Sequence, residues 1–176
     1  MILIALGSSL SFAGEAPDRI ILSALGALGR VGEVNARSRL YASPAWPDPS
    51  DPPFVNAVAS ISTAYPPLVL LEALQAIEAG FGRRRSAERN RPRTLDLDII
   101  DYKGIIRAPD DVSPLALPHP GVAERDFVLA PLAEVAPFWV HPISGLGVEA
   151  LLAACQIRGA RPLAVDAGAP LLQRNS

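Results

Sequence analysis

The chain has 176 residues, a formal net charge of −2 and 49% apolar residues, enough for one domain with a real hydrophobic core. This balance excludes a disordered tail and a generally basic nucleic-acid binder. Cys155 is the single cysteine, so a disulfide framework and a cysteine-based zinc site are excluded, and a reducing, cytoplasmic setting is expected. No window approaches the ~18 apolar residues of a membrane span, so we expect no membrane partner.

Strand and helix patterns alternate from the N-terminus. Residues 2–6 form a continuous apolar run that ends at Gly7-Ser8-Ser9, which predicts a buried strand followed by a tight turn. An early proline and a stripe of isoleucine and leucine side chains predict a helix over residues 17–30. Imperfect alternation of polar and apolar residues predicts a strand over residues 34–41.

A proline-rich loop precedes the next strand. Residues 42–53 contain five prolines and can form neither a helix nor a central strand. Trp46 in this loop is interpreted as either a packing anchor or part of a ligand lid. Alternation predicts a strand over residues 54–61 with Phe54 and Asn56 on one face. A ring beside an amide suits a flat heterocycle, although such a pair is more often a detail of a sheet face.

The clearest helical pattern covers residues 67–79. A proline lies near its start, four aliphatic side chains form one stripe, and Gly80 is placed to end it. Glu78, close to the C-terminal end, is unfavourable against the helix dipole. We therefore expect a local partner for its carboxylate.

Six arginines fall between residues 83 and 93, directly before a run from 95 to 100 that alternates branched apolar with acidic residues. This period of two predicts a half-buried strand with Asp96 and Asp98 on one face and the apolar side chains facing the core (Leu95, Leu97 and Ile99). Two carboxylates this close repel unless a cation or a proton lies between them. Mg²⁺ suits such a pair and takes phosphate oxygens as further ligands, which arginine forks also bind. The pattern therefore indicates a magnesium-nucleotide site.

Two other classes fit parts of this pattern. An arginine run alone is typical of a solvated loop or a nucleic-acid patch, but the chain lacks a broad basic face and aromatic residues beside the run. An Asp-x-Asp motif is also compatible with a metal-dependent nucleotide-sugar transferase. Such an enzyme is usually a longer doubly wound domain, and it would leave Phe54, Asn56 and Phe127 unexplained.

A turn and a restrained histidine follow the acidic strand. Lys103-Gly104 predicts a turn that pairs the strand over residues 95–102 with Ile105-Ile106 in a hairpin. His119 lies between two prolines, which restrict its backbone to extended conformations. By itself it is typical of an exposed loop histidine.

Two helices are predicted in the C-terminal part, one opening at Glu124 and ending near Pro137, and one over residues 148–155. Residues 160–176 have little periodicity and are expected to form a weakly structured tail. No internal repeat or linker divides the chain, so we expect one domain over residues 1–176. The order of elements indicates an α+β fold of the ferredoxin-like kind, with a mainly antiparallel sheet flanked by helices.

The motif at residues 83–100, Arg-x-Arg-x-x-Glu-Arg-x-x-Pro-Arg-Thr-Leu-Asp-Leu-Asp-Ile-Ile, resembles the signature of the 6-hydroxymethyl-7,8-dihydropterin pyrophosphokinase family. The resemblance extends over roughly residues 2–155. Asn90 departs from a tryptophan common in the family, and residues 7–9 read Gly-Ser-Ser where the family usually has Gly-Ser-Asn. Trp46 is a candidate to substitute for the missing ring.

The resemblance implies transfer of the terminal pyrophosphate of ATP to the hydroxymethyl group of the dihydropterin, with release of AMP, in folate biosynthesis. It implies one or two Mg²⁺ ions, with ATP as co-substrate and the pterin as the second partner. We expect a monomer without nucleic-acid partners. We also expect the arginine-rich loop, which carries like charge, to be mobile when empty and to close over the ligands.

The same resemblance carries over specific roles onto matching positions. The residues concerned are Asp96 and Asp98 for the metal; Arg83, Arg93, Asp96 and Asp98 for catalysis; Glu78, Arg85, Arg89, Arg93, Ile99, His119 and Arg125 for ATP; and Gly7, Ser43, Pro44, Trp46, Phe54, Asn56, Asp96 and Phe127 for the pterin.

Overall fold

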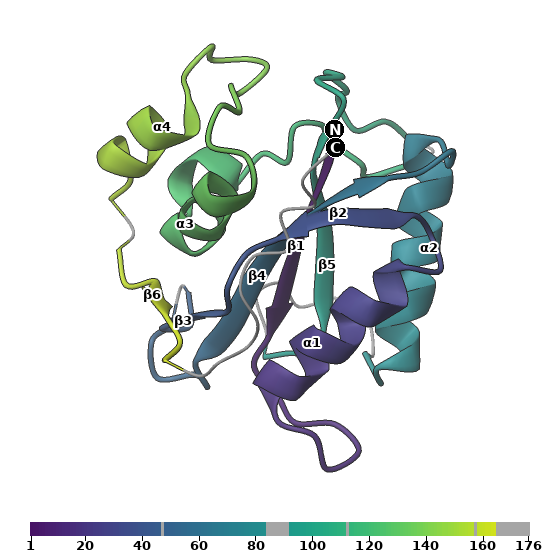
Figure 1. Cartoon of the computed structure of the whole chain (residues 1–176), viewed down its shortest axis with the longest axis vertical. Coiled ribbons are helices and arrows are strands. Elements are labelled where there is room, and N and C mark those ends of the chain that lie inside the picture. Colours follow the sequence, from purple (N-terminus) through teal and green to yellow (C-terminus); the bar gives the residue numbers. More distant parts are fainter. Residues whose placement is uncertain (47, 84–91, 112, 157, 165–176) are drawn as a thin grey trace, which may run out of the picture.

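Figure 1 shows the computed structural model, which describes residues 1–46, 48–83, 92–111, 113–156 and 158–164. The strands form one sheet with helices on both of its faces. In chain order the elements are β1 (Ile2–Ser8), α1 (Pro17–Leu28), β2 (Glu33–Arg37), β3 (Tyr41–Ser43), β4 (Phe54–Ser62), α2 (Pro67–Gly80), β5 (Asp96–Tyr102), the 3₁₀ turn η1 (Val122–Glu124), α3 (Asp126–Val135), α4 (Val148–Ala154) and β6 (Arg161–Pro162).

The strand pairs of the described sheet are all antiparallel. The order of the strands is β5-β1-β4-β3-β6, and β2 pairs with β4 as well. The apolar run that predicted β1 suits its position between β4 and β5, because a central strand is covered on both faces. The predicted α+β class with a mainly antiparallel sheet is confirmed.

A hydrophobic core lies on each face of the sheet (Figure 1). α1 and α2 cover one face, where Leu74 is fully buried, and α3 and α4 cover the other, where Leu132 is fully buried. The apolar side chains of the acidic strand join the first core, as predicted (Leu95, Leu97 and Ile99). Since successive side chains of a strand alternate, Asp96 and Asp98 lie on the face of α3.

The strand predicted over residues 34–41 is in fact two strands, β2 and β3, separated at residues 38–40. Ser38 donates its N–H to the carbonyl of Val58 (2.9 Å), and its hydroxyl accepts the Val58 N–H (3.0 Å). The Arg39 N–H instead binds the Glu134 carboxylate of α3 (3.0 Å). Side chains thus replace backbone partners here, which alternation in the sequence does not reveal.

The hairpin predicted after β5 is wrong. Lys103 and Gly104 do make a turn, with φ of 56° and 73°, but Ile105 and Ile106 are exposed and lie outside the described strands. The chain instead closes a wider loop through an isolated bridge between Arg107 and Leu117, with N–H···O distances of 2.8 and 2.9 Å. The prolines of this segment favour such an irregular path over a second strand.

Helix ends differ from the predictions by one or two residues. α3 begins at Asp126 instead of Glu124, because Arg125 is extended (φ −118°, ψ 102°) and separates η1 from the helix. α1 ends at Leu28, and α4 ends at Ala154. Of the helices in the described ranges, none has the length and apolar character needed to cross a membrane.

Within the described residues after α4, a short strand lies in the region predicted to be a weakly structured tail. Arg161 and Pro162 form β6, which pairs antiparallel with β3, and the N–H of Leu163 binds the carbonyl of Leu40 (2.8 Å). This pairing depends on a strand that is distant in sequence, so local periodicity could not indicate it.

Candidate active site

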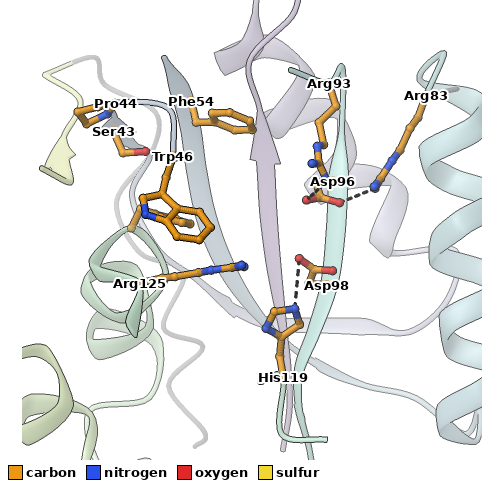
Figure 2. Close-up of a pocket in the computed structure, with 11 residues that line it drawn as sticks. Ser43, Pro44, Trp46, Phe54, Arg83, Arg93, Asp96, Asp98, His119 and Arg125 are labelled. Atoms are coloured by element: carbon orange, nitrogen blue, oxygen red, sulfur yellow. Dashed lines mark hydrogen bonds and ion pairs between the residues drawn. The ribbon is translucent and has the colours of Figure 1, made fainter. Parts of the chain in front are cut away.

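Most of the predicted site residues line one pocket of about 240 Å³, at the edge where β1 ends and β4 and β5 begin (Figure 2). They come from the proline-rich loop, both ends of the arginine-rich segment, β4, β5, the loop that contains His119, and the start of α3. The lining residues are Ser43, Pro44, Trp46, Phe54, Arg83, Arg93, Asp96, Asp98, His119, Arg125 and Phe127.

Asp96 is held by the two ends of the arginine-rich segment. Arg83 contacts Oδ1 of Asp96, and Nη1 of Arg93 donates to Oδ2 at 2.9 Å. Arg83 also binds the buried carboxylate of Glu78, which accepts the N–H of Leu97 at 2.7 Å. Although burial lowers the pKa of Arg83, the charges of Asp96 and Glu78 outweigh burial and raise it, so the guanidinium stays charged. Arg83 is the local partner expected for Glu78.

Asp98 has a different environment from Asp96. Its side chain is 41% exposed, toward the pocket. Loss of hydration within the pocket, followed by the negative charges of Asp96 and Glu78, raises the pKa of the Asp98 carboxyl to about 7, against the opposing effect of Arg125 and Arg83. The ionised form of Asp98 therefore lacks sufficient neutralising charge, and a cation at this position would supply it.

His119 faces Asp98 across the pocket floor (Figure 2). Its Nδ1 accepts the N–H of Gly121 (3.1 Å), so Nε2 carries the proton and lies 4.0 Å from Oδ2 of Asp98. Burial, followed by the positive charge of Arg125, lowers the pKa of His119 to about 4. The imidazole is therefore neutral at pH 7 and offers an N–H to a ligand, without forming an ion pair with Asp98.

Aromatic rings dominate the opposite end of the pocket. The guanidinium of Arg125 lies 5.7 Å from the ring centre of Trp46 and 5.9 Å from that of Phe127, within the range of cation–π attraction. Phe54 lines the pocket from β4, and Asn56 is buried beside it with Nδ2 donating to Oγ of Ser43 (3.0 Å). The arrangement can stack a flat ring and bind its polar edge.

The predicted pterin residues Gly7 and Asn56 line a smaller adjoining cavity of about 70 Å³, together with Phe54 and Phe127. A Cβ at Gly7 would meet Oδ1 of Asn56 at 3.6 Å, an ordinary contact. Gly7 is therefore not required there by close packing.

A second pocket of about 250 Å³ meets the first at Asp96, Asp98, Arg83 and His119. The predicted residues Glu78 and Ile99 line it. It also contains residues that the sequence analysis missed: Leu71, Gln75, Leu97, Pro114, Leu115, Ala116 and Pro120. Most of them lie on α2 or in the irregular loop before His119, and no local pattern distinguishes them. Two pockets thus share one pair of carboxylates.

The sequence analysis also missed that the turn after β1 supports the site. The hydroxyl of Ser8 donates to the carbonyl of Thr94 (2.6 Å), and the N–H of Arg93 donates to the hydroxyl of Ser9 (3.0 Å). Ser9 also donates its own N–H to the carbonyl of Arg93 (2.9 Å). Ser8, together with Ser9, which departs from the family pattern, therefore holds the segment that carries Arg93 to Asp96.

Some predictions fall outside the described residues. Arg85 and Arg89, both predicted to bind ATP, lie there, and so does Asn90, the departure from the family tryptophan. Trp46, the candidate substitute, lines the pocket and is 41% exposed.

Comparison with known proteins agrees with this geometry. The family model for 7,8-dihydro-6-hydroxymethylpterin-pyrophosphokinase (HPPK) matches residues 3–137. A Pseudomonas aeruginosa protein named 2-amino-4-hydroxy-6-hydroxymethyldihydropteridine pyrophosphokinase is 42% identical over 158 residues, which are 89% of this chain and 92% of that protein. The chain belongs to the HPPK family. The family and the enzyme class predicted from residues 83–100 are confirmed.

Other HPPK relatives agree. A Synechocystis protein with the same name is 42% identical over 120 residues, 68% of this chain and 59% of that protein. A solved Plasmodium falciparum HPPK-DHPS chain superposes with a TM-score of 0.66 at 14% identity, over 87% of this chain. The present chain spans 43% of that longer protein, and the likeness supports the HPPK fold alone.

The donor set of this HPPK suits a hard divalent ion. Within the described ranges, no group of three or more His, Cys, Asp or Glu side chains could hold a metal by itself. Asp96 and Asp98 offer carboxylate oxygens from one face of β5, and both line the two pockets. Such a pair fits Mg²⁺ when phosphate oxygens complete the coordination.

Proposed function

We propose that this HPPK chain transfers the terminal diphosphate of ATP to the hydroxymethyl oxygen of 6-hydroxymethyl-7,8-dihydropterin, forming AMP and the pterin diphosphate. The observation that carries the proposal is the meeting of two pockets at Asp96 and Asp98. One pocket offers aromatic rings for the pterin, and the other lies among α2, β5 and the loop before His119 for the nucleotide. The hydroxyl and the triphosphate would then meet at the carboxylates.

The reaction demands positioning and charge neutralisation. The hydroxymethyl oxygen attacks the β-phosphorus, the bond from that phosphorus to the oxygen of the α-phosphate breaks, and the hydroxyl proton is released. Arg83, Arg93 and Arg125 are the described guanidiniums that line the pocket, and we assign them to the phosphate oxygens. The neutral imidazole of His119 is assigned to a phosphate or sugar oxygen through its Nε2–H.

Asp96 and Asp98 are assigned to one or two Mg²⁺ ions. Held there, such ions would neutralise phosphate charge and would lower the pKa of the attacking hydroxyl. Arg83 and Arg93 contact Asp96 and also line the pocket, so we assign them both to this carboxylate and to the phosphates.

We further propose that the chain acts as a monomeric single domain in the cytoplasm. Residues 161 and 162, after α4, return to the sheet and pair with β3, as expected of a single domain. Sedimentation equilibrium should give a mass of 18.6 kDa. A mass twice as large would contradict the monomer without affecting the assignment of the pocket.

The proposed reaction is tested by ³¹P NMR of the purified protein with Mg-ATP, with and without 6-hydroxymethyl-7,8-dihydropterin. We expect pterin-dependent formation of AMP and a new organic diphosphate signal. ADP in place of AMP would indicate an ordinary kinase or ATPase and would contradict the proposal. The same holds if AMP formed equally fast without the pterin.

A further inference from the structure

Asp126, at the start of α3, binds a segment that lies far from it in the sequence. It is 7% exposed, and its Oδ2 accepts the N–H groups of Gly159 (2.6 Å) and Ala160 (2.9 Å). A buried carboxylate is costly unless donors satisfy it, and these two amides are the described donors to it. We call residues 159–163 the C-terminal strap. The family model matches residues 3–137, so the strap lies beyond that match.

The strap then crosses to the opposite wall of the pocket. Arg161 and Pro162 pair with Ala42 and Tyr41 of β3, the strand that leads into the proline-rich loop (Figure 1). Leu163 continues the pairing to residue 40. The strap therefore joins the Asp126 side chain at the start of α3 to the backbone of β3.

Gly159 also contacts the proline-rich loop directly. A Cβ at this glycine would lie 2.9 Å from Cδ and 3.2 Å from Cγ of Pro44, closer than a side chain tolerates. Pro44 lines the pocket next to Trp46 (Figure 2). Any displacement of the strap is therefore transmitted to a residue of the pocket wall.

The two walls are not packed tightly against each other at this point. A cavity of about 230 Å³ is lined by residues of the loop, of α3 and of the strap, among them Trp46, Phe127, Asp126 and Gly159. The strap thus contacts both walls where side chains do not fill the space between them. Glu134 makes a separate link from α3 to Tyr41, farther along the helix.

We propose that the C-terminal strap sets the width of the aromatic end of the pocket, with Asp126 as the positioning residue that anchors it. Asp126 lies between Arg125 and Phe127 in the chain, and both line the pocket. The inference rests on the proposed function, since the ligand at this end is taken to be the pterin. Asp126 itself acts through Gly159 and Pro44.

The test compares full-length variants by pterin affinity, nucleotide affinity and amide hydrogen exchange. Pterin binding is measured by calorimetry with 6-hydroxymethyl-7,8-dihydropterin in the presence of saturating Mg-α,β-methylene-ATP. D126A and G159A should raise the pterin Kd by about 10-fold, since small misplacements of a binding wall are costly. The nucleotide Kd should stay within about twofold, and exchange at residues 41–46 should become faster. D126N keeps an acceptor oxygen and should recover most of the affinity.

Matched controls separate positioning from general destabilisation. Asp101 is also a buried carboxylate, accepting the Gly104 N–H (2.8 Å) and the Trp139 indole N–H (3.1 Å). D101A should therefore lower the Tm without changing the pterin Kd. Gly26 of α1 has open space around it, so G26A controls for G159A.

The outcomes distinguish the two proposals. A pterin Kd within twofold of the unmodified protein in both D126A and G159A, with unchanged exchange at residues 41–46, would overturn the strap inference alone. If D126A does not fold, the pterin Kd and hydrogen exchange of G159A alone test the strap inference. Absence of pterin binding by the unmodified protein would overturn the proposed function, and with it the assignment of this end of the pocket.

Discussion

The carboxyl of Asp98 is subject to opposing demands of stability and function. In the unfolded chain it titrates near 3.8, whereas in the folded protein loss of hydration within the pocket and the charges of Asp96 and Glu78 raise its pKa to about 7. The folded state therefore binds more protons than the unfolded state between these values. The contribution of Asp98 to the free energy of unfolding therefore falls as the pH rises from about 4 to 7, whereas the lowered pKa of His119 contributes with the opposite sign over part of this range.

Ionised Asp98 is expected to destabilise the folded protein at high pH. D98N removes the ionised carboxyl, so the empty variant should have a higher Tm than the unmodified protein at pH 8, and the difference should shrink as the pH approaches 4. Turnover with Mg-ATP should fall by at least about 100-fold, the usual effect of removing one charge contact to the transition state. Thermal melts across this pH range and the ³¹P assay check both expectations.

D101N, on the same strand, is the control for this prediction. Asp101 has satisfied hydrogen bonds to Gly104 and Trp139, so its replacement should lower the Tm at pH 8. If D98N were also less stable than the unmodified protein at pH 8, the electrostatic interpretation of Asp98 would be wrong.

At the scale of an element, the turn after β1 supports the start of β5. Ser8 and Ser9 bind the backbone of residues 93 and 94 by three hydrogen bonds of 2.6, 3.0 and 2.9 Å. Arg93 in turn donates to Asp96. The turn that departs from the family pattern thus positions both Arg93 and Asp96, the proposed metal ligand.

We therefore predict that the double variant S8A/S9A weakens the site more than the fold. Loss of two side-chain hydrogen bonds should cost about 1 kcal/mol each in stability, because water replaces them only in part. The apparent affinity for Mg-ATP should fall several-fold, since Arg93 and Asp96 lose their support. Chemical denaturation and nucleotide calorimetry measure the two effects.

Ser62 provides a comparison for that variant. Its hydroxyl donates to Asn35 (2.8 Å) at an exposed position away from the pocket. S62A should leave Mg-ATP affinity unchanged. Equal nucleotide affinity in S8A/S9A and the unmodified protein would show that the turn has no role in the site.

At the scale of the whole molecule, one sheet serves two cores. Leu74 of α2 and Leu132 of α3 are both fully buried, on opposite faces of the sheet. The same central strands, β1 and β4, contribute residues to each core. Neither core can therefore lose its packing without affecting the strands that support the other.

L74A and L132A should accordingly behave alike. Each should lower stability by about 2–5 kcal/mol, the usual cost of a buried Leu→Ala change. Because the sheet is shared, unfolding should remain a single transition in both variants. Leu74 and Leu132 belong to separate clusters, so the effects of the two changes in the double variant should be close to additive. Calorimetry tests this, and two resolved transitions in either single variant would indicate that the cores unfold independently.

Local patterns were sufficient for the elements whose environment is set by their own residues. The alternation at residues 95–100 predicted β5 and the face of Asp96 and Asp98, and the stripe at residues 67–79 predicted α2 within one residue. The predicted hairpin at Ile105 and Ile106 was wrong, since a turn signal does not determine whether the following residues find a partner strand.

The sequence by itself therefore determined the family, the elements and the identity of the charged and aromatic groups that gather in the pocket, because motif spacing and periodicity are local. Only the tertiary structure decided which of these groups are neutral or charged and which neighbouring residues position them. The pKa values of Asp98 and His119, and the contact of Gly159 with Pro44, depend on neighbours distant in sequence. Burial and electrostatic coupling arise between segments, and no local pattern encodes them.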